Sequence, residues 1–139
     1  MSIPYGGIDH IGIVVRDINA AKATYRDVLG FNVTGGDILE DRGLEVVFVD
    51  TGNSRIELIA PTRADSEVSS FLDKRGEGIH HMCVRVPNID EALATLKTQG
   101  ARLLHETAKA GAHNTRVAFV HPKATHGVLL ELVEAHNHP

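Results

Sequence analysis

The sequence has one cysteine, no tryptophan and few aromatic residues. A lone Cys83 cannot form an internal disulfide, which suits a reducing compartment. No run approaches the roughly 18 apolar residues of a membrane span, and no basic segment followed by an apolar one opens the chain, so we expect neither a membrane helix nor a secretory signal. A net charge of −4 gives no general attraction to nucleic acid or anionic lipid. We therefore predict a cytoplasmic protein, or one of the mitochondrial matrix if a transit peptide precedes this sequence.

What the sequence does have is an internal repeat. The matching segments are 8–18 with 79–89, 46–49 with 117–120, and 55–59 with 129–133. His81 follows His10 by 71 positions, whereas Glu131 follows Glu57 by 74, so the second copy has three extra residues before its last segment. Each copy therefore contributes one histidine and one glutamate at equivalent positions.

Hydrophobic periodicity predicts similar elements in both copies. Alternating apolar residues predict strands at 8–15, 44–50 and 54–60, then at 79–86, 102–105, 116–121 and 127–133. After the first strand of each copy, a helix is expected from a capping residue, Asp17 or Asn88, to a glycine, Gly30 or Gly100. The residues expected to point inward from the first helix are Ile18, Ala21, Tyr25, Val28 and Leu29.

Two shorter segments carry turn or connector signals. Gly35-Gly36 predicts a turn, and Gly52-Asn53 is a typical hairpin dipeptide. Residues 61–75 are expected to connect the copies and to contain a short helix capped by Ser66. We predict a single α+β domain over 1–139, with a first module at about 6–61, a connector at about 62–75 and a second module at about 76–135.

Strand alternation assigns the repeated polar residues to one face of each module. Ile11, Ile13 and Val15 should pack against the first helix, which leaves His10 on the opposite side, together with Glu57 of a later strand. The same alternation puts His81 with Glu131. Both pairs are expected on faces without helix cover.

Two imidazoles and two carboxylates suit a divalent cation. Cobalt, manganese, nickel, iron(II) and zinc accept this donor set, and magnesium is less suited because of the nitrogens. Four protein ligands would leave two positions of an octahedron for substrate oxygens. A solvent-facing role for each polar residue is the alternative, but their recurrence in register and the cost of burying an unpaired carboxylate favour a metal. The repeat selects His81 rather than His80, which has no assigned role.

Several segments together resemble a known family. They are Ile8-Asp9-His10-Ile11-Gly12-Ile13, Tyr25-Arg26-Asp27-Val28-Leu29-Gly30, Gly52-Asn53-Ser54-Arg55-Ile56-Glu57-Leu58, Gly76-Glu77-Gly78-Ile79-His80-His81, and His121 through Leu132. Over residues 8–134 the chain resembles the methylmalonyl-CoA epimerase family of the vicinal oxygen chelate superfamily. The resemblance implies two βαβββ modules that form a metal-binding cleft of curved mixed sheet. It places the family's metal ligands on His10, His81, Glu131 and, as the fourth, Glu57.

The resemblance also implies a reaction, the interconversion of (R)- and (S)-methylmalonyl-CoA by removal and return of the C2 proton. Inversion needs proton transfer on both faces, for which Glu131 is the first candidate and Glu45 the second. Some family members have a catalytic glutamate at the position that Val46 occupies here, and alternation aims Glu45 at the opposite face. The implied cofactor is a divalent ion, cobalt first, with manganese, nickel, zinc or magnesium as alternatives.

The implied partner is an acyl-CoA thioester. Lys123, with Arg116 and Lys109, is expected near its phosphates, and Arg85 is expected either to meet the substrate carboxylate or to pair with Glu57 or Glu131. A homodimer is expected because small sheets have open edges.

Three other functions fit parts of the pattern. A glyoxalase I-like lactoylglutathione lyase has a similar ligand set but not the Gly78-Ile79-His80-His81 and His121-Pro122-Lys123 segments. An extradiol dioxygenase, with two histidines and one carboxylate on iron(II), would leave Glu57 without a role. A metal-free, drug-sequestering binding protein would lack the four ligands and would hold no stoichiometric metal.

Overall fold

The computed structural model describes residues 2–111 and 114–134. It divides into two compact units, one of residues 10–80 and one that joins the N-terminal residues up to Asp9 with the chain from His81 onward. Each unit has its own strands and its own apolar core.

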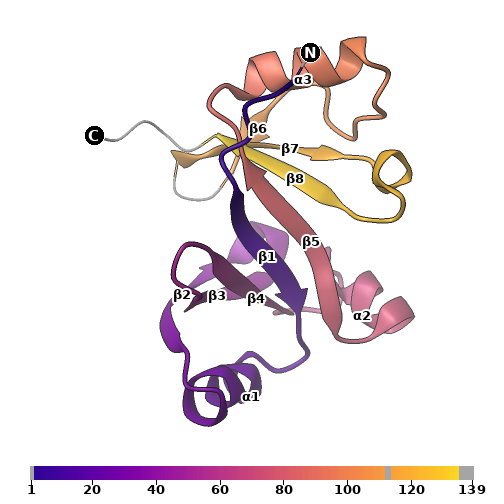
Figure 1. The fold of residues 1–139 in the computed structure, drawn as a ribbon. Helices are drawn as coiled ribbons and strands as arrows, with labels where there is room; N and C mark the ends of the chain where they lie inside the picture. The colour runs from indigo at the N-terminus through magenta and orange to yellow at the C-terminus, as the bar shows by residue number, and fades with distance from the viewer. Residues whose placement is uncertain (1, 112–113, 135–139) are drawn as a thin grey trace. The chain divides into compact units, whose positions relative to one another are not determined.

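The 10–80 unit contains a four-stranded sheet with the order β2-β3-β4-β1 (Figure 1). Its elements in chain order are β1 (Ile8–Val14), α1 (Ile18–Ala23), β2 (Asn32–Leu39), β3 (Leu44–Asp50), β4 (Arg55–Pro61) and α2 (Ser69–Arg75). Strand β1 runs parallel to β4, and the other neighbours are antiparallel. The sheet is therefore mixed, as the resemblance implied.

Two apolar clusters lie on the two faces of this sheet. On one face, Ile13 and Val15 pack with Ile18 of α1, which confirms the predicted helix side. On the other face, Val14 packs with Val68 and Leu72 of the α2 region. The expectation that this second face is free of helix cover is therefore wrong at Val14, because the connector folds back as α2 onto the same face.

The segment after α1 differs from its prediction. Asp17 caps α1 by accepting from the backbone N–H groups of Asn19 and Ala20, and Gly30 ends the segment with a φ of 78°. Between them, Thr24–Val28 is a π-helical turn. A π turn has more residues per turn than an α-helix, so the 3.6-residue pattern fails there. Val28 and Leu29 are consequently 77% and 56% exposed rather than buried.

Gly35-Gly36 forms a bulge within β2 rather than the expected turn. Thr34 pairs with Phe48 and Asp37 pairs with Val46, and the register shifts between these two pairs. Gly35 has a φ of 44°, which a glycine adopts without strain. Two glycines therefore permit the strand to continue through an irregular step.

The second unit has the corresponding order β5-β8-β7-β6 (Figure 1). Its elements are β5 (Gly78–Arg85), α3 (Ile89–Thr98), β6 (Lys109–Ala110), β7 (Arg116–Val120) and β8 (Leu130–Glu134). Strand β5 is parallel to β8, and the remaining neighbours are antiparallel. The strand expected at 102–105 is wrong, because the pairing there is a single bridge between Leu103 and Val120 and the paired strand is β6.

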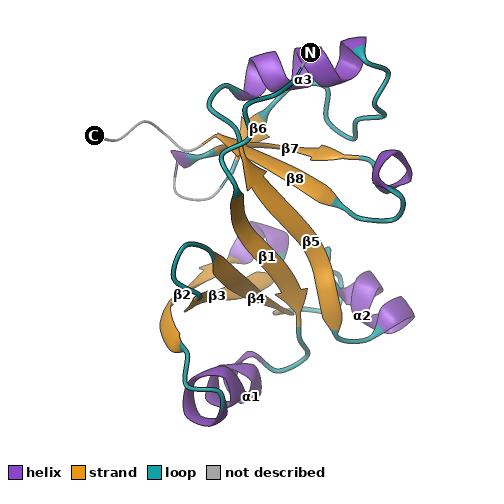
Figure 2. Cartoon of the chain, in the orientation of Figure 1, coloured by secondary structure: helices purple, strands orange, loops and turns teal. Residues whose placement is uncertain are grey.

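Helix α3 covers one face of this unit's strands (Figure 2). Asn88 caps it as predicted, by accepting from the N–H of Glu91. Ile89, Ala92 and Leu93 of α3 are buried against Ala118 of β7 and Leu132 of β8. Helix α3 thus excludes water from one face of β7 and β8, and Glu131 lies on the opposite face of β8.

The N-terminal residues belong to this second unit. Gly6 N–H donates to the carbonyl of Arg85 at 2.8 Å, and Arg85 N–H donates to the carbonyl of Gly7 at 2.9 Å. Ile3 packs against the α3 cluster.

The predicted α+β class is confirmed, because the order strand, helix, three strands occurs twice. No helix in the described part of the chain has the length and apolar character needed to cross a bilayer.

Candidate metal centre

The first histidine–glutamate pair lies within the 10–80 unit. His10 is on β1 and Glu57 is on the parallel neighbour β4, where Glu57 is level with Gly12, two residues beyond the histidine. His10 Nε2 lies 3.8 Å from Glu57 Oε1, and the two side chains are only 10% and 17% exposed. Phe48 is the neighbour of Glu57 on β3. The Arg55 guanidinium lies over the Phe48 ring, 4.4 Å from its centroid, so a positive charge is close to this histidine–glutamate pair.

The second pair has the same arrangement in the other unit. Glu131 on β8 is level with Cys83 on β5, again two residues beyond the histidine, His81. His81 Nε2 lies 3.3 Å from Glu131 Oε1, with side-chain exposures of 7% and 11%. The His81 ring also meets Phe119 edge-on, at 6.0 Å between ring centroids.

Each glutamate is flanked in the same way by its antiparallel neighbour. Glu57 pairs with Phe48 on β3, and Glu131 pairs with Phe119 on β7. Phe48 and Phe119 are themselves equivalent in the sequence repeat. The repeat is therefore reproduced in strand register, and not only in residue type, within each unit.

The donor set fits a divalent cation. Ligand atoms about 2.0–2.2 Å from one zinc-like ion lie roughly 3 Å apart. The 3.3 Å separation in the His81–Glu131 pair is close to that value, and the 3.8 Å separation in the His10–Glu57 pair is somewhat wider. Buried imidazole and carboxylate groups held this close together are what a cation of borderline hardness binds. His10, His81 and Glu131 are accordingly candidate ligands for a metal ion.

Comparison with known proteins gives the same family. Residues 9–119 match the model of the glyoxalase/bleomycin resistance protein/dioxygenase superfamily. Mitochondrial methylmalonyl-CoA epimerase of Mus musculus is 43% identical over 131 residues, which are 94% of this chain and 74% of that protein. The chain belongs to the methylmalonyl-CoA epimerase family.

Solved structures of this family share the fold. Methylmalonyl-CoA epimerase of Mycobacterium tuberculosis is 38% identical, with a TM-score of 0.89 over 99% of this chain and 93% of that one. A methylmalonyl-CoA epimerase solved with methylmalonyl-CoA and NH4+ is 36% identical, with a TM-score of 0.84 over 96% of each chain.

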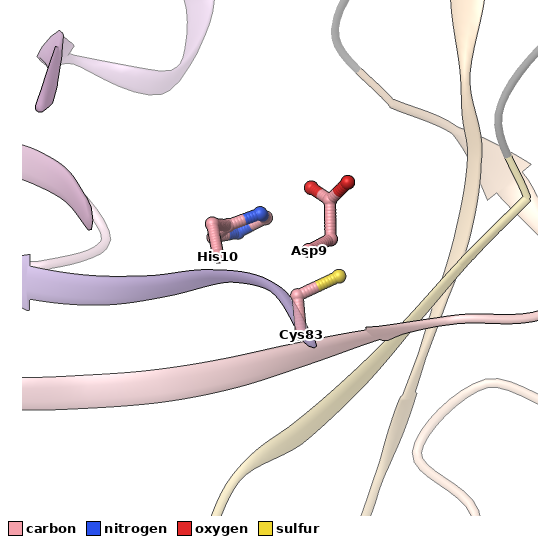
Figure 3. A group of neighbouring side chains, drawn as sticks. All are labelled: Asp9, His10 and Cys83. Carbon is pink, nitrogen blue, oxygen red and sulfur yellow. The ribbon is translucent and has the colours of Figure 1, made fainter. Parts of the chain in front are cut away.

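Arg85 has a partner that the sequence reasoning missed. Its Nε donates to Asp9 Oδ1 at 3.1 Å, so Arg85 forms an ion pair with Asp9, a carboxylate that the sequence reasoning did not name. Asp9 also lies near the fully buried thiol of Cys83, with a carboxylate oxygen within 4.8 Å of the sulfur (Figure 3). The signal was present, because Asp9 belongs to the quoted N-terminal segment, but nothing in the sequence joins it to a residue 76 positions away.

His80, which had no assigned role, packs its ring edge-on against Phe71 of α2, at 5.1 Å between centroids. The consecutive histidines of this epimerase family member thus make different contacts: His80 contacts the connector helix, and His81 faces a glutamate.

The position of Glu45 weighs against it as the second base. Glu45 pairs with Ala60 on β4, whereas Val46 pairs with Ile59. Ala60 belongs to the cluster that packs on α1, and Val46 and Ile59 belong to the opposite one. Register therefore puts Glu45 on the α1 face and Val46 on the face of Glu57, as alternation predicted.

The cations proposed for coenzyme A phosphates have different surroundings. Arg116 makes a two-pronged ion pair with Asp90 of α3, at 2.9 and 2.8 Å, and this pairing lowers the pKa of Asp90. Arg116 is therefore engaged with helix α3, and its place near the substrate phosphates stays a prediction. Lys123 and Lys109 are exposed and form no ion pair within the described ranges.

Proposed function

We propose that this protein catalyses the metal-dependent epimerisation of (R)- and (S)-methylmalonyl-CoA. The observation that carries the proposal is the pair of equivalent, largely buried histidine–glutamate contacts in a chain that belongs to the epimerase family. Relatives named for this activity cover nearly the whole chain, and one was solved with methylmalonyl-CoA bound.

His10, Glu57, His81 and Glu131 are proposed to hold one divalent ion in common. Two nitrogen and two oxygen donors suit several divalent ions. The family resemblance puts cobalt first, with manganese, nickel, zinc or magnesium as alternatives. A bound divalent ion would supply positive charge for the thioester oxygen when the C2 proton leaves. The alternative of one ion per pair predicts a different stoichiometry. A titration should therefore give one ion per chain, and either His10→Ala or His81→Ala alone should abolish tight binding.

Glu131 is proposed to move the C2 proton. The Glu131 side chain is 11% exposed, so few water molecules reach its carboxylate. A carboxylate in such a position, beside a histidine, can accept a proton from carbon and return it. Phe119 is the neighbour of Glu131 on β7, and the Phe119 ring meets the His81 ring edge-on. Inversion needs a second group. Glu45 remains the named candidate from sequence, although its face argues against it.

Lys123 and Arg85 are proposed to bind substrate. Arg85 is 38% exposed despite its ion pair with Asp9, so a substrate carboxylate could still approach it. A homodimer and a cytoplasmic or mitochondrial-matrix location complete the proposal, and the mouse relative is named as mitochondrial.

Deuterium incorporation tests this proposal. Methylmalonyl-CoA is incubated in D2O with metal-free protein and then with each divalent ion, and C2 deuterium is followed by mass spectrometry. We expect exchange only with metal and its loss in His10→Ala and His81→Ala. If metal-free His10→Ala protein still exchanged the C2 proton for deuterium, the proposed metal site would be refuted. Turnover of a glutathione thiohemiacetal in place of exchange would favour the lactoylglutathione lyase, and absence of both activities and of metal would favour a binding protein.

A further inference from the structure

Phe119 of β7 is held, on its side away from β8, by two residues that lie outside the strands. The Phe119 N–H donates to His105 Nδ1 at 3.1 Å. The Phe119 carbonyl accepts from the N–H groups of Leu104 and His105, at 2.9 and 3.3 Å. In a regular ladder a backbone carbonyl would accept the N–H. Here a side-chain nitrogen takes that place, so one imidazole helps to fix the backbone of this strand residue.

These hydrogen bonds also decide how Phe119 meets its neighbour on β8. The N–H and the carbonyl of one residue in an antiparallel strand point to the same side. Because both groups of Phe119 point toward residues 104 and 105, Phe119 and Glu131 are a pair without mutual backbone hydrogen bonds. Side chains lie closer together in such a pair than in a hydrogen-bonded one. The pairing thus favours a short distance between the Phe119 and Glu131 side chains.

The Phe119 ring connects His105 with His81. It lies 5.7 Å from the His105 ring and 6.0 Å from the His81 ring, between centroids, and both contacts are edge-on. His81 Nε2 is in turn 3.3 Å from Glu131 Oε1, and only 7% of the His81 side chain is exposed. All four residues belong to the second unit. A displacement of Phe119 would therefore change the packing around a buried imidazole.

His105 is neutral when it accepts the Phe119 N–H. An accepting Nδ1 carries no proton, so the proton of the neutral ring is on Nε2. Burial, and then the charge of Lys109, lower the pKa of His105. The neutral ring therefore predominates at pH 7, and the Phe119 N–H keeps its acceptor.

We propose that His105 is a positioning residue that sets the orientation of the His81 imidazole through Phe119. This inference rests on the proposed function where it takes His81 and Glu131 as metal ligands. Groups outside the ligand set orient the ligands, and a ligand that is already oriented binds an ion more tightly. His105 thus raises metal affinity without being a ligand itself.

Cobalt(II) binding tests the proposal without requiring catalysis. Co²⁺ is titrated into the full metal-free chain, and calorimetry gives its Kd. His105→Leu removes the acceptor and should weaken Co²⁺ binding about fivefold, which is what the net contribution of one hydrogen bond allows. His105→Asn places an acceptor oxygen near the position of Nδ1 and should restore the Kd to within about twofold of wild type. Equal affinities in wild type and His105→Leu, or equal losses in both variants, would overturn the proposal.

A control variant separates loss of orientation from loss of stability. Leu96 of α3 packs in the same unit, in the core on the face of the sheet opposite Glu131. Leu96→Ala should destabilise the fold at least as much as His105→Leu and leave the Co²⁺ Kd within about twofold of wild type. Urea denaturation ranks the stabilities. If the Kd rose in Leu96→Ala as it does in His105→Leu, the role of His105 would be structural only, and the proposal would be wrong.

The orientation of His81 can also be measured without any metal. The ring C–H signals of His81 are recorded by NMR in the metal-free chain at a single alkaline pH, and they are assigned from the spectrum of His81→Gln. His105→Leu should shift these signals, because the Phe119 ring beside them moves. His105→Asn and Leu96→Ala should leave them in place. Unchanged His81 signals in His105→Leu would refute the positioning role.

The two proposals fail in different ways. If the wild-type chain neither binds Co²⁺ nor exchanges the C2 proton, the proposed function is wrong. A shift of the His81 signals in metal-free His105→Leu would still support the positioning role. If the wild type exchanges the proton with metal, and His105→Leu has the same Co²⁺ Kd and the same His81 signals, the positioning role alone is wrong.

Discussion

The two modules place a glutamate in the same strand register but surround it differently. In the first, Glu57 lies between Gly12 on one neighbouring strand and Phe48 on the other. In the second, Glu131 lies between Cys83 and Phe119. The phenylalanine is retained, whereas glycine in one module is replaced by a buried cysteine in the other. The register around each glutamate is therefore what the duplication preserves.

Elements further from the glutamates diverge between the modules. The first has a six-residue α1 that continues as a π turn, and the second has a regular ten-residue α3. Strand β2 has eight residues, and its counterpart β6 has two. His105 stands at the repeat position of Thr34, and its ring Nδ1 accepts the Phe119 N–H at 3.1 Å. A side chain thus supports Phe119 where the first module pairs Thr34 with Phe48. The groups that contact the two phenylalanines therefore differ between the modules, whereas the strand register at the glutamates is the same.

The largest expected asymmetry concerns the two glutamates. Glu131→Gln should lower turnover by about 10²–10⁴-fold, because it removes a proton-transfer group as well as a charged ligand. Glu57→Gln keeps an oxygen donor and should cost less than about tenfold. Epimerisation rates at saturating metal, with metal Kd measured beside them, check this difference. Equal losses in the two variants would mean that Glu131 acts only as a ligand.

The two cores should respond alike. Leu58 and Leu132 occupy equivalent positions and are both 0% exposed. Leu58→Ala and Leu132→Ala should each lower the free energy of unfolding by about 2–5 kcal/mol. Urea denaturation followed by circular dichroism measures both. A loss below about 1 kcal/mol in only one variant would show that this module contributes little to the cooperative fold.

A smaller contrast is expected at two left-handed positions. Gly43 and Asn114 are equivalent in the repeat and have φ values of 67° and 60°. A Cβ on Gly43 would lie 2.8 Å from Ser66 Cβ, so Gly43→Ala should destabilise the chain by about 1–3 kcal/mol. Asn114→Gly should change stability by less than about 0.5 kcal/mol, since glycine accepts the same φ. Thermal melts of both variants check this contrast, and a fully tolerated Gly43→Ala would contradict it.

The smallest expected effect is the pH dependence that His105 gives to the stability of the second module. Burial, and then the charge of Lys109, lower the pKa of His105 below its ordinary value of 6.5. The unfolded chain therefore binds more protons in the window below pH 6.5, and stability should fall as pH decreases through it. His105→Gln should reduce this slope and cost about 1 kcal/mol at neutral pH through the Phe119 hydrogen bond. Urea midpoints between pH 5 and 8 measure it. His121, whose pKa is also lowered, contributes to the remaining slope.

Most strands and both histidine–glutamate pairs were predictable because they follow a period of two residues. Alternation decides the face of the sheet on which each side chain lies. The sequence could therefore select His81 rather than His80, and it could assign Glu45 and Val46 to opposite faces of β3. Local backbone irregularities were not predictable by the same means. The π turn displaces Val28 and Leu29 from the helical pattern, and the bulge at Gly35-Gly36 resembles a turn in composition.

Contacts between distant segments were also beyond the sequence. Arg85 pairs with Asp9, and Arg116 pairs with Asp90, because strand order and helix placement bring these groups together. The sequence offered several carboxylates for each arginine and no measure of distance. The same holds for α2, whose contact with Val14 depends on how the connector folds back.

The N-terminal residues lie with the second unit, although the chain continues from them directly into the first. Gly6 and Gly7 hydrogen-bond to Arg85, and Ile3 packs on the α3 cluster. A fusion tag or deletion at the start of the polypeptide would therefore disturb the half encoded last. The effect of changes at that end should therefore be measured on the folding of the carboxyl-terminal module. If the gene were split between its two repeats, that module would lose the N-terminal residues that pack with it.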